Sequence, residues 1–106
     1  MTNDKFNKIL ESQLDYCKQL LITKNIEYKG ELDRLHTFKV AAEMQGCNNK
    51  QALAGMMAKH TASVYDMCKR GEYSIEKWEE KITDHINYLL LLKAIVIEEA
   101  ENNEQN

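Results

Sequence analysis

The sequence predicts an all-α protein built as a four-helix bundle. Strand patterns are nearly absent, because no stretch alternates apolar and polar residues for long and the β-branched residues are scattered. The chain contains no proline, so no proline kinks or breaks a predicted helix. Three glycines stand where helical patterns stop, the usual place for a residue that ends a helix. They are Gly30, Gly46 and Gly71.

Two helices are expected before Gly46. The first begins at Asn3 or Asp4, as a possible N-cap, and runs to about 24–28. Its apolar residues recur at three- and four-residue steps, which is typical of an amphipathic helix. The second spans about 31–45 and carries a shorter apolar stripe.

Two further helices are expected after Gly46. Asn48 and Gln51 have the spacing of a capping box, in which two side chains satisfy the free amides at a helix start. That helix should end at Gly71, where a glycine can adopt the left-handed conformation. The fourth helix should begin after Ser74, a favourable N-cap, and continue to about Glu99.

The length of 106 residues predicts a single all-α domain over 1–106. Its ordered core should cover about 4–99, and the acidic stretch 100–106 reads as a solvated C-terminal tail. The net charge is -3 and no run of Lys or Arg is present. Binding to a nucleic-acid backbone is therefore not expected.

The chain is expected to be cytoplasmic, in the host cell if it is encoded by a phage. Its first residues are polar and lack the apolar region of a signal peptide. The longest apolar run, Leu89 to Leu92, is far shorter than the ~20 residues that span a bilayer, so no membrane association is expected. Cys17, Cys47 and Cys68 are odd in number and form no Cys-x-x-Cys pair, as in a reducing compartment.

The fourth predicted helix is apolar on nearly every side between Leu89 and Ile97. A helix of this kind must be covered all round. Four short helices can cover only part of it, so the sequence predicts a homo-oligomer that associates through the helix 74–99.

The same helix carries a polar stripe formed by Glu80, Asp84 and Asn87. Two turns later this stripe becomes apolar at Leu91 and Ala94, so the carboxylates should point into an interior, a cleft or a subunit interface. Oxygen ligands on one face suit a hard cation such as Mg²⁺. Two alternatives stay open: a set of Lys or Arg partners from other helices, or ordinary surface charge.

A second dense polar patch covers 24–30, at the end of the first predicted helix. It offers the Glu27 carboxylate, the Tyr28 ring and the Lys29 ammonium group. Such a set can stack a base and neutralise phosphates, and the alternative is an ordinary polar turn. His60 and His85 share helix faces with apolar residues, which favours satisfied core histidines over zinc ligands.

Three segments resemble one protein family. The segment 80–88, Glu-Lys-Ile-Thr-Asp-His-Ile-Asn-Tyr, resembles the acidic-x-x-x-Asp-x-x-Asn-Tyr element of the nucleotide-modification-associated domain family of phages and bacteria. The segment 24–30 looks like that family's Lys-Asn-x-acidic-Tyr-Gly element, with Lys29 inserted before the glycine. The segment 55–63 is similar to its lysine-containing helix. The family is grouped with all-α nucleoside triphosphate pyrophosphatases of the MazG type.

The resemblance implies a MazG-like, oligomeric four-helix fold that uses Mg²⁺ to bind or hydrolyse a nucleoside triphosphate. It assigns the metal and catalytic roles to Glu80 and Asp84, with Glu27 as a further metal ligand. The acidic pair here is spaced four residues apart, whereas the MazG group uses pairs spaced three apart. The residues expected to contact the substrate are Asn87, Lys29, Lys59 and Tyr28.

Two functions are therefore expected from the sequence. The first is Mg²⁺-dependent binding or pyrophosphohydrolysis of NTPs or dNTPs in phage nucleotide metabolism. The alternative is a non-catalytic helical interaction protein of a phage or prophage that acts on a host or phage protein. Only the first function requires the Glu80 and Asp84 carboxylates, which would bind the metal.

Overall fold

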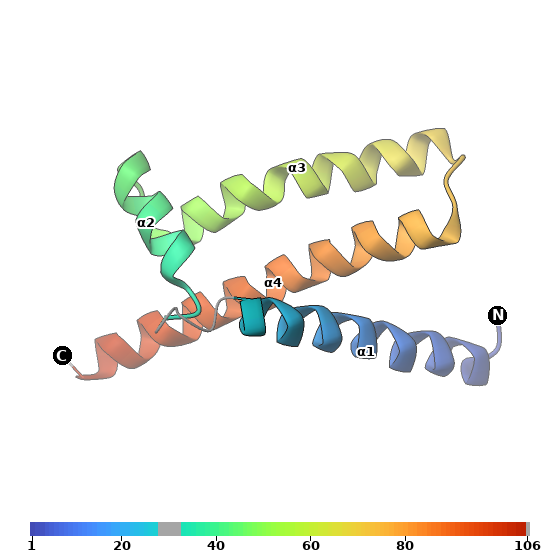
Figure 1. Ribbon diagram of the computed structural model, residues 1–106, viewed down its shortest axis with the longest axis horizontal. Helices are drawn as coiled ribbons and strands as arrows, with labels where there is room; N and C mark the ends of the chain where they lie inside the picture. The colour runs from blue at the N-terminus through green and yellow to red at the C-terminus, as the bar shows by residue number, and fades with distance from the viewer. Residues whose placement is uncertain (28–32, 106) are drawn as a thin grey trace.

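Four helices make up the part of the chain that the structure describes (Figure 1). This computed structural model describes the backbone of residues 1–27 and 33–105, and the side chains of 1–23 and 33–104. No strand occurs in those residues, so the predicted all-α class is confirmed. The helices are α1 (Asn3–Glu27), α2 (His36–Gln45), α3 (Asn49–Arg70) and α4 (Ile75–Gln105).

The long helix α4 is the centre of the arrangement. It packs against α3 on one side and against α1 on another, while α2 packs against α3. The helices α3 and α4 form an antiparallel hairpin, and α1 crosses α4 while running in the same general direction (Figure 1). Over the described residues α1 packs against no other helix than α4. The helices α1 and α3 therefore pack directly on α4, and α2 packs on α3.

Local hydrogen bonds confirm two of the predicted helix starts. The Gln51 amide donates to Asn48 Oδ1 at 2.8 Å, and the Asn48 amide donates to Gln51 Oε1 at 3.1 Å, which completes the capping box of α3. The Lys77 amide donates to Ser74 Oγ at 3.1 Å, so Ser74 caps α4. These caps satisfy amides that the first turn of a helix leaves free.

The start of α1 and the end of α4 differ from the prediction. Thr2 caps α1 in place of Asn3 or Asp4, because the Lys5 amide donates to Thr2 Oγ1 at 3.1 Å. The helix α4 continues to Gln105 and takes up almost all of the acidic segment that was predicted to be a tail.

The helix α2 begins at His36, later than its predicted start at 31. Asp33 Oδ1 accepts a hydrogen bond from the Leu35 amide at 2.9 Å, and the Asp33 carbonyl accepts one from the His36 amide at 3.1 Å. An aspartate side chain that accepts a hydrogen bond from the backbone amide two residues later competes with helix formation. The residues 33–35 therefore form a turn.

Glycines end α2 and α3 as predicted. Gly46 has φ +66° and Gly71 has φ +71°, both in the left-handed region that side chains with a Cβ rarely adopt. The Gly71 amide donates to the Met67 carbonyl at 2.9 Å and so closes the last turn of α3. Gly30 lies outside the described residues.

The apolar core lies where α2, α3 and α4 meet. Its buried members are Leu35, Phe38, Leu53 and Ile95, and five half-buried side chains surround them. The packing of Ile95 against this cluster uses the C-terminal half of α4. The half-buried members of this core are Met56, Met57, Tyr88, Leu91 and Leu92.

None of the described helices is long and apolar enough to cross a membrane.

Candidate functional site

A groove between α1 and the N-terminal half of α4 is the best candidate for a binding site. Its volume is about 570 Å³, which is within the usual range of roughly 300–1,000 Å³ for small-molecule sites. Both Glu80 and Asp84 line it. The lining residues are Tyr16, Gln19, Leu20 and Thr23 of α1 and Glu76, Glu79, Glu80, Thr83 and Asp84 of α4.

Among the described side chains, one hydrogen-bonding residue, Gln13, joins the two helices beside the groove. Gln13 Nε2 donates to the Thr83 hydroxyl at 2.8 Å, and it also approaches Cys17 Sγ at 3.4 Å. Thr83 and Cys17 are both buried. This contact fixes where α1 crosses α4, and the crossing places the next turns of α1 opposite the acidic side of α4.

Four carboxylates line the α4 side of the groove. Glu76, Glu80 and Asp84 follow one another at four-residue steps, so they share one helix face. Glu79 lies one residue before Glu80 and borders the same space. Glu80 is exposed and Asp84 is half-buried. The structure thus brings the two predicted metal ligands together and adds two acids that the prediction did not include.

None of these four carboxylates forms an ion pair with a described Lys or Arg side chain. The alternative in which basic partners from other helices neutralise the stripe has no support in this part of the chain. Four negative charges along a groove produce a potential that attracts cations. The groove is therefore electrostatically suited to a cation, or to a ligand that carries one.

The described donors fit a hydrated cation better than a fully enclosed one. Among the residues with described side chains, no group of three or more His, Cys, Asp and Glu is close enough together to hold a metal ion. Mg²⁺ commonly uses one or two carboxylates and completes its shell with water and phosphate oxygens. Glu80 and Asp84 can supply those two carboxylates, while the side chain of Glu27 lies outside the described residues.

Two other predicted site residues do not line the groove. The side chain of Asn87 is only 6% exposed, and neither its Oδ1 nor its Nδ2 has a hydrogen-bond partner. Lys59 is exposed on α3, and α3 contributes no residue to the groove. Tyr28 and Lys29 lie outside the described residues, so their predicted contacts with a substrate stay predictions.

The sequence did not predict that α1 supplies one wall of the groove. Tyr16, Gln19 and Thr23 face the acids from the opposite wall, and nothing in a single sequence shows which helix lies against α4. The four-residue steps from Glu76 to Asp84 were visible and could have extended the predicted acidic stripe by one turn.

His60 on α3 and His85 on α4 lie in the α3–α4 hairpin, away from the groove lining. His60 stacks on Tyr88 with ring centroids 4.9 Å apart, and His85 Nε2 lies 3.0 Å from the Thr61 hydroxyl. His60 is half-buried and its Nδ1 has no partner, so the prediction of a satisfied histidine is wrong for this residue. His85 does have the partner expected of a core histidine.

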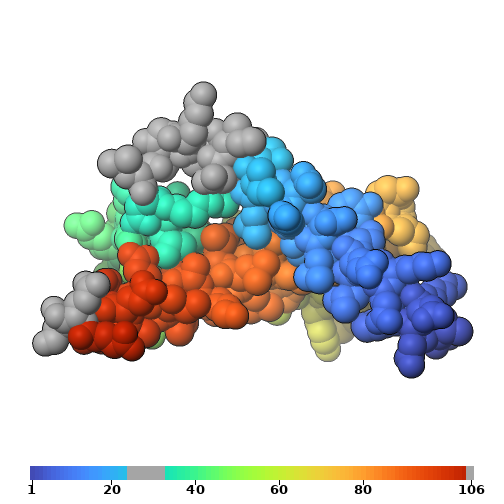
Figure 2. All heavy atoms as spheres, turned by 90° about the horizontal axis from the view of Figure 1, so that it is seen from below, coloured from blue at the N-terminus to red at the C-terminus, as the bar shows by residue number. Residues whose placement is uncertain are grey.

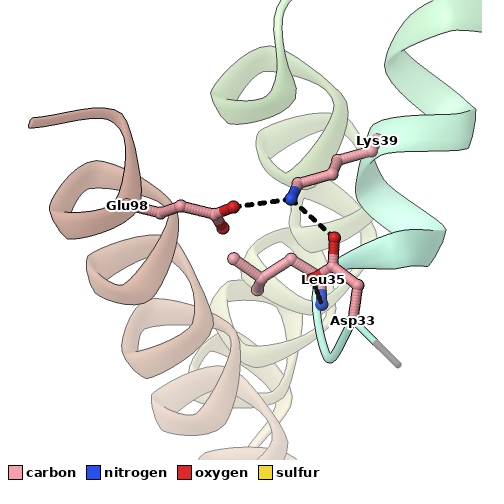
Figure 3. A network of polar contacts seen from close by, with 4 residues as sticks. All are labelled: Asp33, Leu35, Lys39 and Glu98. Atoms are coloured by element: carbon pink, nitrogen blue, oxygen red, sulfur yellow. Dashed lines mark hydrogen bonds and ion pairs between the residues drawn. The ribbon is translucent and has the colours of Figure 1, made fainter. Parts of the chain in front are cut away.

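A separate ionic network ties α2 to the C-terminal half of α4 (Figure 3). Lys39 Nζ lies 2.6 Å from Asp33 Oδ2 and 2.7 Å from Glu98 Oε1. The hydrogen bond from Lys39 lowers the pKa of Asp33, and the bonds to Asp33 and Glu98 raise the pKa of Lys39. All three side chains are more than a third exposed, so water screens these interactions.

Comparison of the chain with known proteins found no matching family model, no similar curated protein and no similar solved structure. The resemblance to the nucleotide-modification-associated domain family therefore stays a prediction. A binding site is supported by the groove itself and by the four carboxylates that line it.

Proposed function

We propose that the α1–α4 groove binds a divalent cation and, through it, the phosphate groups of a nucleotide. The observation that carries this proposal is the set of four carboxylates that line one groove without a described basic partner. A cation relieves the mutual repulsion of such carboxylates, and a phosphate supplies the ligands that they leave open. The family resemblance names a nucleoside triphosphate as the source of those phosphates.

Each wall of the groove has its own role in this proposal. Glu80 and Asp84 supply oxygen ligands from one face of α4, while Glu76 and Glu79 add negative charge beside them. The half-exposed ring of Tyr16 on α1 offers an aromatic surface to a base. A bound cation would neutralise phosphate charge and activate water for pyrophosphate release. The residues of the chain hold and orient that cation.

Calorimetric titration with MgCl₂ or MnCl₂, alone and with a panel of NTPs and dNTPs, tests binding, and pyrophosphate release tests hydrolysis. Glu80→Gln and Asp84→Asn keep the size of each side chain and remove its charge. Each should weaken cation-dependent nucleotide binding by about tenfold or more, which is ~1.4 kcal/mol.

The control variant is Glu72→Gln, which removes an exposed carboxylate between α3 and α4 and outside the groove. It should leave binding within about twofold of the unmodified chain, a change of well under 1 kcal/mol. Binding that is equal in all three variants, or no binding of cation and nucleotide by the unmodified chain, would rule the proposal out.

The second candidate function is a non-catalytic interaction protein. Two large apolar side chains outside α1 and α4 support it, because Met44 on α2 is 82% exposed and Tyr65 on α3 is 63% exposed. Aromatic residues and methionine are enriched where proteins bind each other. This candidate predicts a specific protein partner whose capture persists in EDTA and is lost in Met44→Ser or Tyr65→Ser. A partner released by EDTA would favour the cation-dependent function.

A further inference from the structure

Most of the described apolar side chains of α1 are only partly buried. Of the side chains described on this helix, only that of Cys17 is fully buried. Phe6, Ile9, Leu10 and Leu14 recur at three- and four-residue steps and are 46% to 59% exposed. An amphipathic helix is stabilised mainly by the burial of its apolar face. The N-terminal half of α1 therefore lacks the packing that its sequence is suited to.

The helix α4 carries a second exposed apolar row. Ile75, Ile82, Leu89 and Val96 follow one another at seven-residue steps and are 38% to 70% exposed. Leu90 and Ile97 lie beside this row and are also exposed. A seven-residue apolar repeat over three heptads is the pattern by which one helix packs along another. We call these six residues the α4 seam.

The size of the molecule supports the same conclusion. The chain exposes 8189 Å², whereas a compact monomer of 12.3 kDa exposes about 6,100 Å². Its radius of gyration is 16.2 Å, against about 13 Å for a compact domain of this length. The excess surface is about 2,000 Å², and one partner in a standard interface buries about 800 Å². A stable dimer therefore needs less surface than this chain leaves open.

The exposed rows of α1 and α4 are continuous with each other. Ile9, Ile75 and Ile82 line one groove of about 380 Å³ between the two helices, together with Trp78. The N-terminal half of α1 diverges from α4 beyond their crossing (Figure 1), and Figure 2 shows the blue atoms of α1 lying across α4. This groove thus has Ile9 on its α1 wall and apolar residues on its α4 wall, so the two exposed rows meet there.

We infer that a second copy of this chain covers the surface, in a symmetric dimer whose two α4 helices pack antiparallel along their seams. In this arrangement the C-terminal half of the partner's α4 lies against the groove lined by Ile9, Ile75 and Ile82. Two-fold symmetry lets one self-complementary surface serve both copies. The dimer needs neither a cation nor a nucleotide. It gives Glu79 a basic partner and does not use Glu80 or Asp84, the two proposed cation ligands, so the dimer and the cation site are tested separately.

Charge selects the antiparallel direction. Glu79 and Lys93 lie seven residues before and after Ile86. A two-fold axis near Ile86 places Glu79 opposite the partner's Lys93, and it does so twice in each dimer. Parallel helices in register would place each Lys93 opposite its own copy, which is repulsive. Neither side chain forms an ion pair with a described residue of its own chain.

Sedimentation equilibrium of the full chain in EDTA tests the dimer. The unmodified protein should have twice the mass of one chain. Leu89→Glu and Val96→Glu should each weaken the dimer by at least about 100-fold, since each places two charges in one interface. Met44→Glu makes the same change at an exposed apolar residue of α2 and should remain dimeric. A monomeric unmodified protein, or seam variants as tightly associated as Met44→Glu, would overturn the inference.

A charge exchange tests the direction of the helices with variants that leave the apolar packing intact. Glu79→Lys and Lys93→Glu should each weaken the dimer by about tenfold, and the double variant should regain most of the loss. Circular dichroism of every variant verifies that its helices are formed. Single variants that associate normally, or a double variant weaker than both, would overturn the antiparallel arrangement.

Discussion

The two ends of this molecule are packed in different ways. At one end α2, α3 and the C-terminal half of α4 bury Leu35, Phe38, Leu53 and Ile95 in a shared core. At the other end α1 meets the N-terminal half of α4 through the contact between Gln13 and Thr83, and its apolar residues stay half-exposed. The first end resembles a finished domain core and the second resembles one side of an interface.

The difference indicates which part of the chain holds the fold and which part is available for binding. Burial of apolar surface is the main favourable term in folding, so the packed end can hold the fold. The open end carries the acidic groove and, on α4 beside it, the first two residues of the α4 seam, Ile75 and Ile82. Clustered carboxylates attract cations, and contiguous exposed apolar side chains mark interaction sites. We therefore expect changes at the two ends to affect different measurements.

The largest effect should come from truncation in the packed end. Leu53 is 0% exposed, so Leu53→Ala should lower the free energy of unfolding by about 3 kcal/mol. Urea denaturation followed by circular dichroism measures this change. Met44→Ala, at an exposed site on α2, should change stability by less than ~0.5 kcal/mol. Equal effects of the two substitutions would show that the core lies elsewhere.

The contact that joins α1 to α4 in the open end should have a smaller and more local effect. Gln13→Ala should cost about 1–2 kcal/mol, because it leaves the buried Thr83 hydroxyl without its donor. Hydrogen exchange should accelerate in α1 more than in α3. A double-mutant cycle with Thr83→Val should give a coupling of about 1 kcal/mol. Strictly additive effects would mean that this bond does not hold α1 on α4.

A substitution of Asn87 should raise the free energy of unfolding, in contrast to the substitutions of Leu53 and Gln13. Its buried amide has no hydrogen-bond partner, and an unpaired buried amide is destabilising. Asn87→Leu, which keeps the number of side-chain heavy atoms, should raise the free energy of unfolding by about 1 kcal/mol. A loss of stability of the same size would show that the amide is paired in solution, for example by water.

The ionic network should have the smallest effect. Lys39→Met should cost about 0.5 kcal/mol at neutral pH and less at high salt, because the network is partly exposed. The lowered pKa of Asp33 gives stability that is present above pH ~4 and is lost as the pH falls through the folded-state pKa.

The raised pKa of Lys39 gives stability that is present below pH ~10 and is lost as the pH rises through its folded-state pKa.

The acidic side of this pH dependence is measured by urea denaturation from pH 3 to pH 8, roughly the range in which carboxyl groups titrate. These measurements compare Lys39→Met with the unmodified protein. The stability difference between them should shrink toward the acidic end. A difference that grows as the pH falls would contradict the assignment.

Local patterns predicted the helices well, and the errors were also local. The capping box of Asn48 and Gln51 and the cap at Ser74 involve residues within one turn, so the sequence shows them directly. The start of α2 was placed too early because Asp33 bonds the Leu35 amide and forms a turn. That competition between a side chain and the helix depends on geometry that composition does not reveal.

The sequence by itself determined the all-α class, most helix ends and the acidic face that carries Glu80 and Asp84, because each depends on residues one or two turns apart. The tertiary structure alone decided that α1 supplies the opposite wall of the groove and that Asn87 is buried. It also decided which apolar rows stay exposed. These features depend on contacts such as Gln13 with Thr83, whose partners are 70 residues apart, and helical periodicity does not specify which helix lies against which.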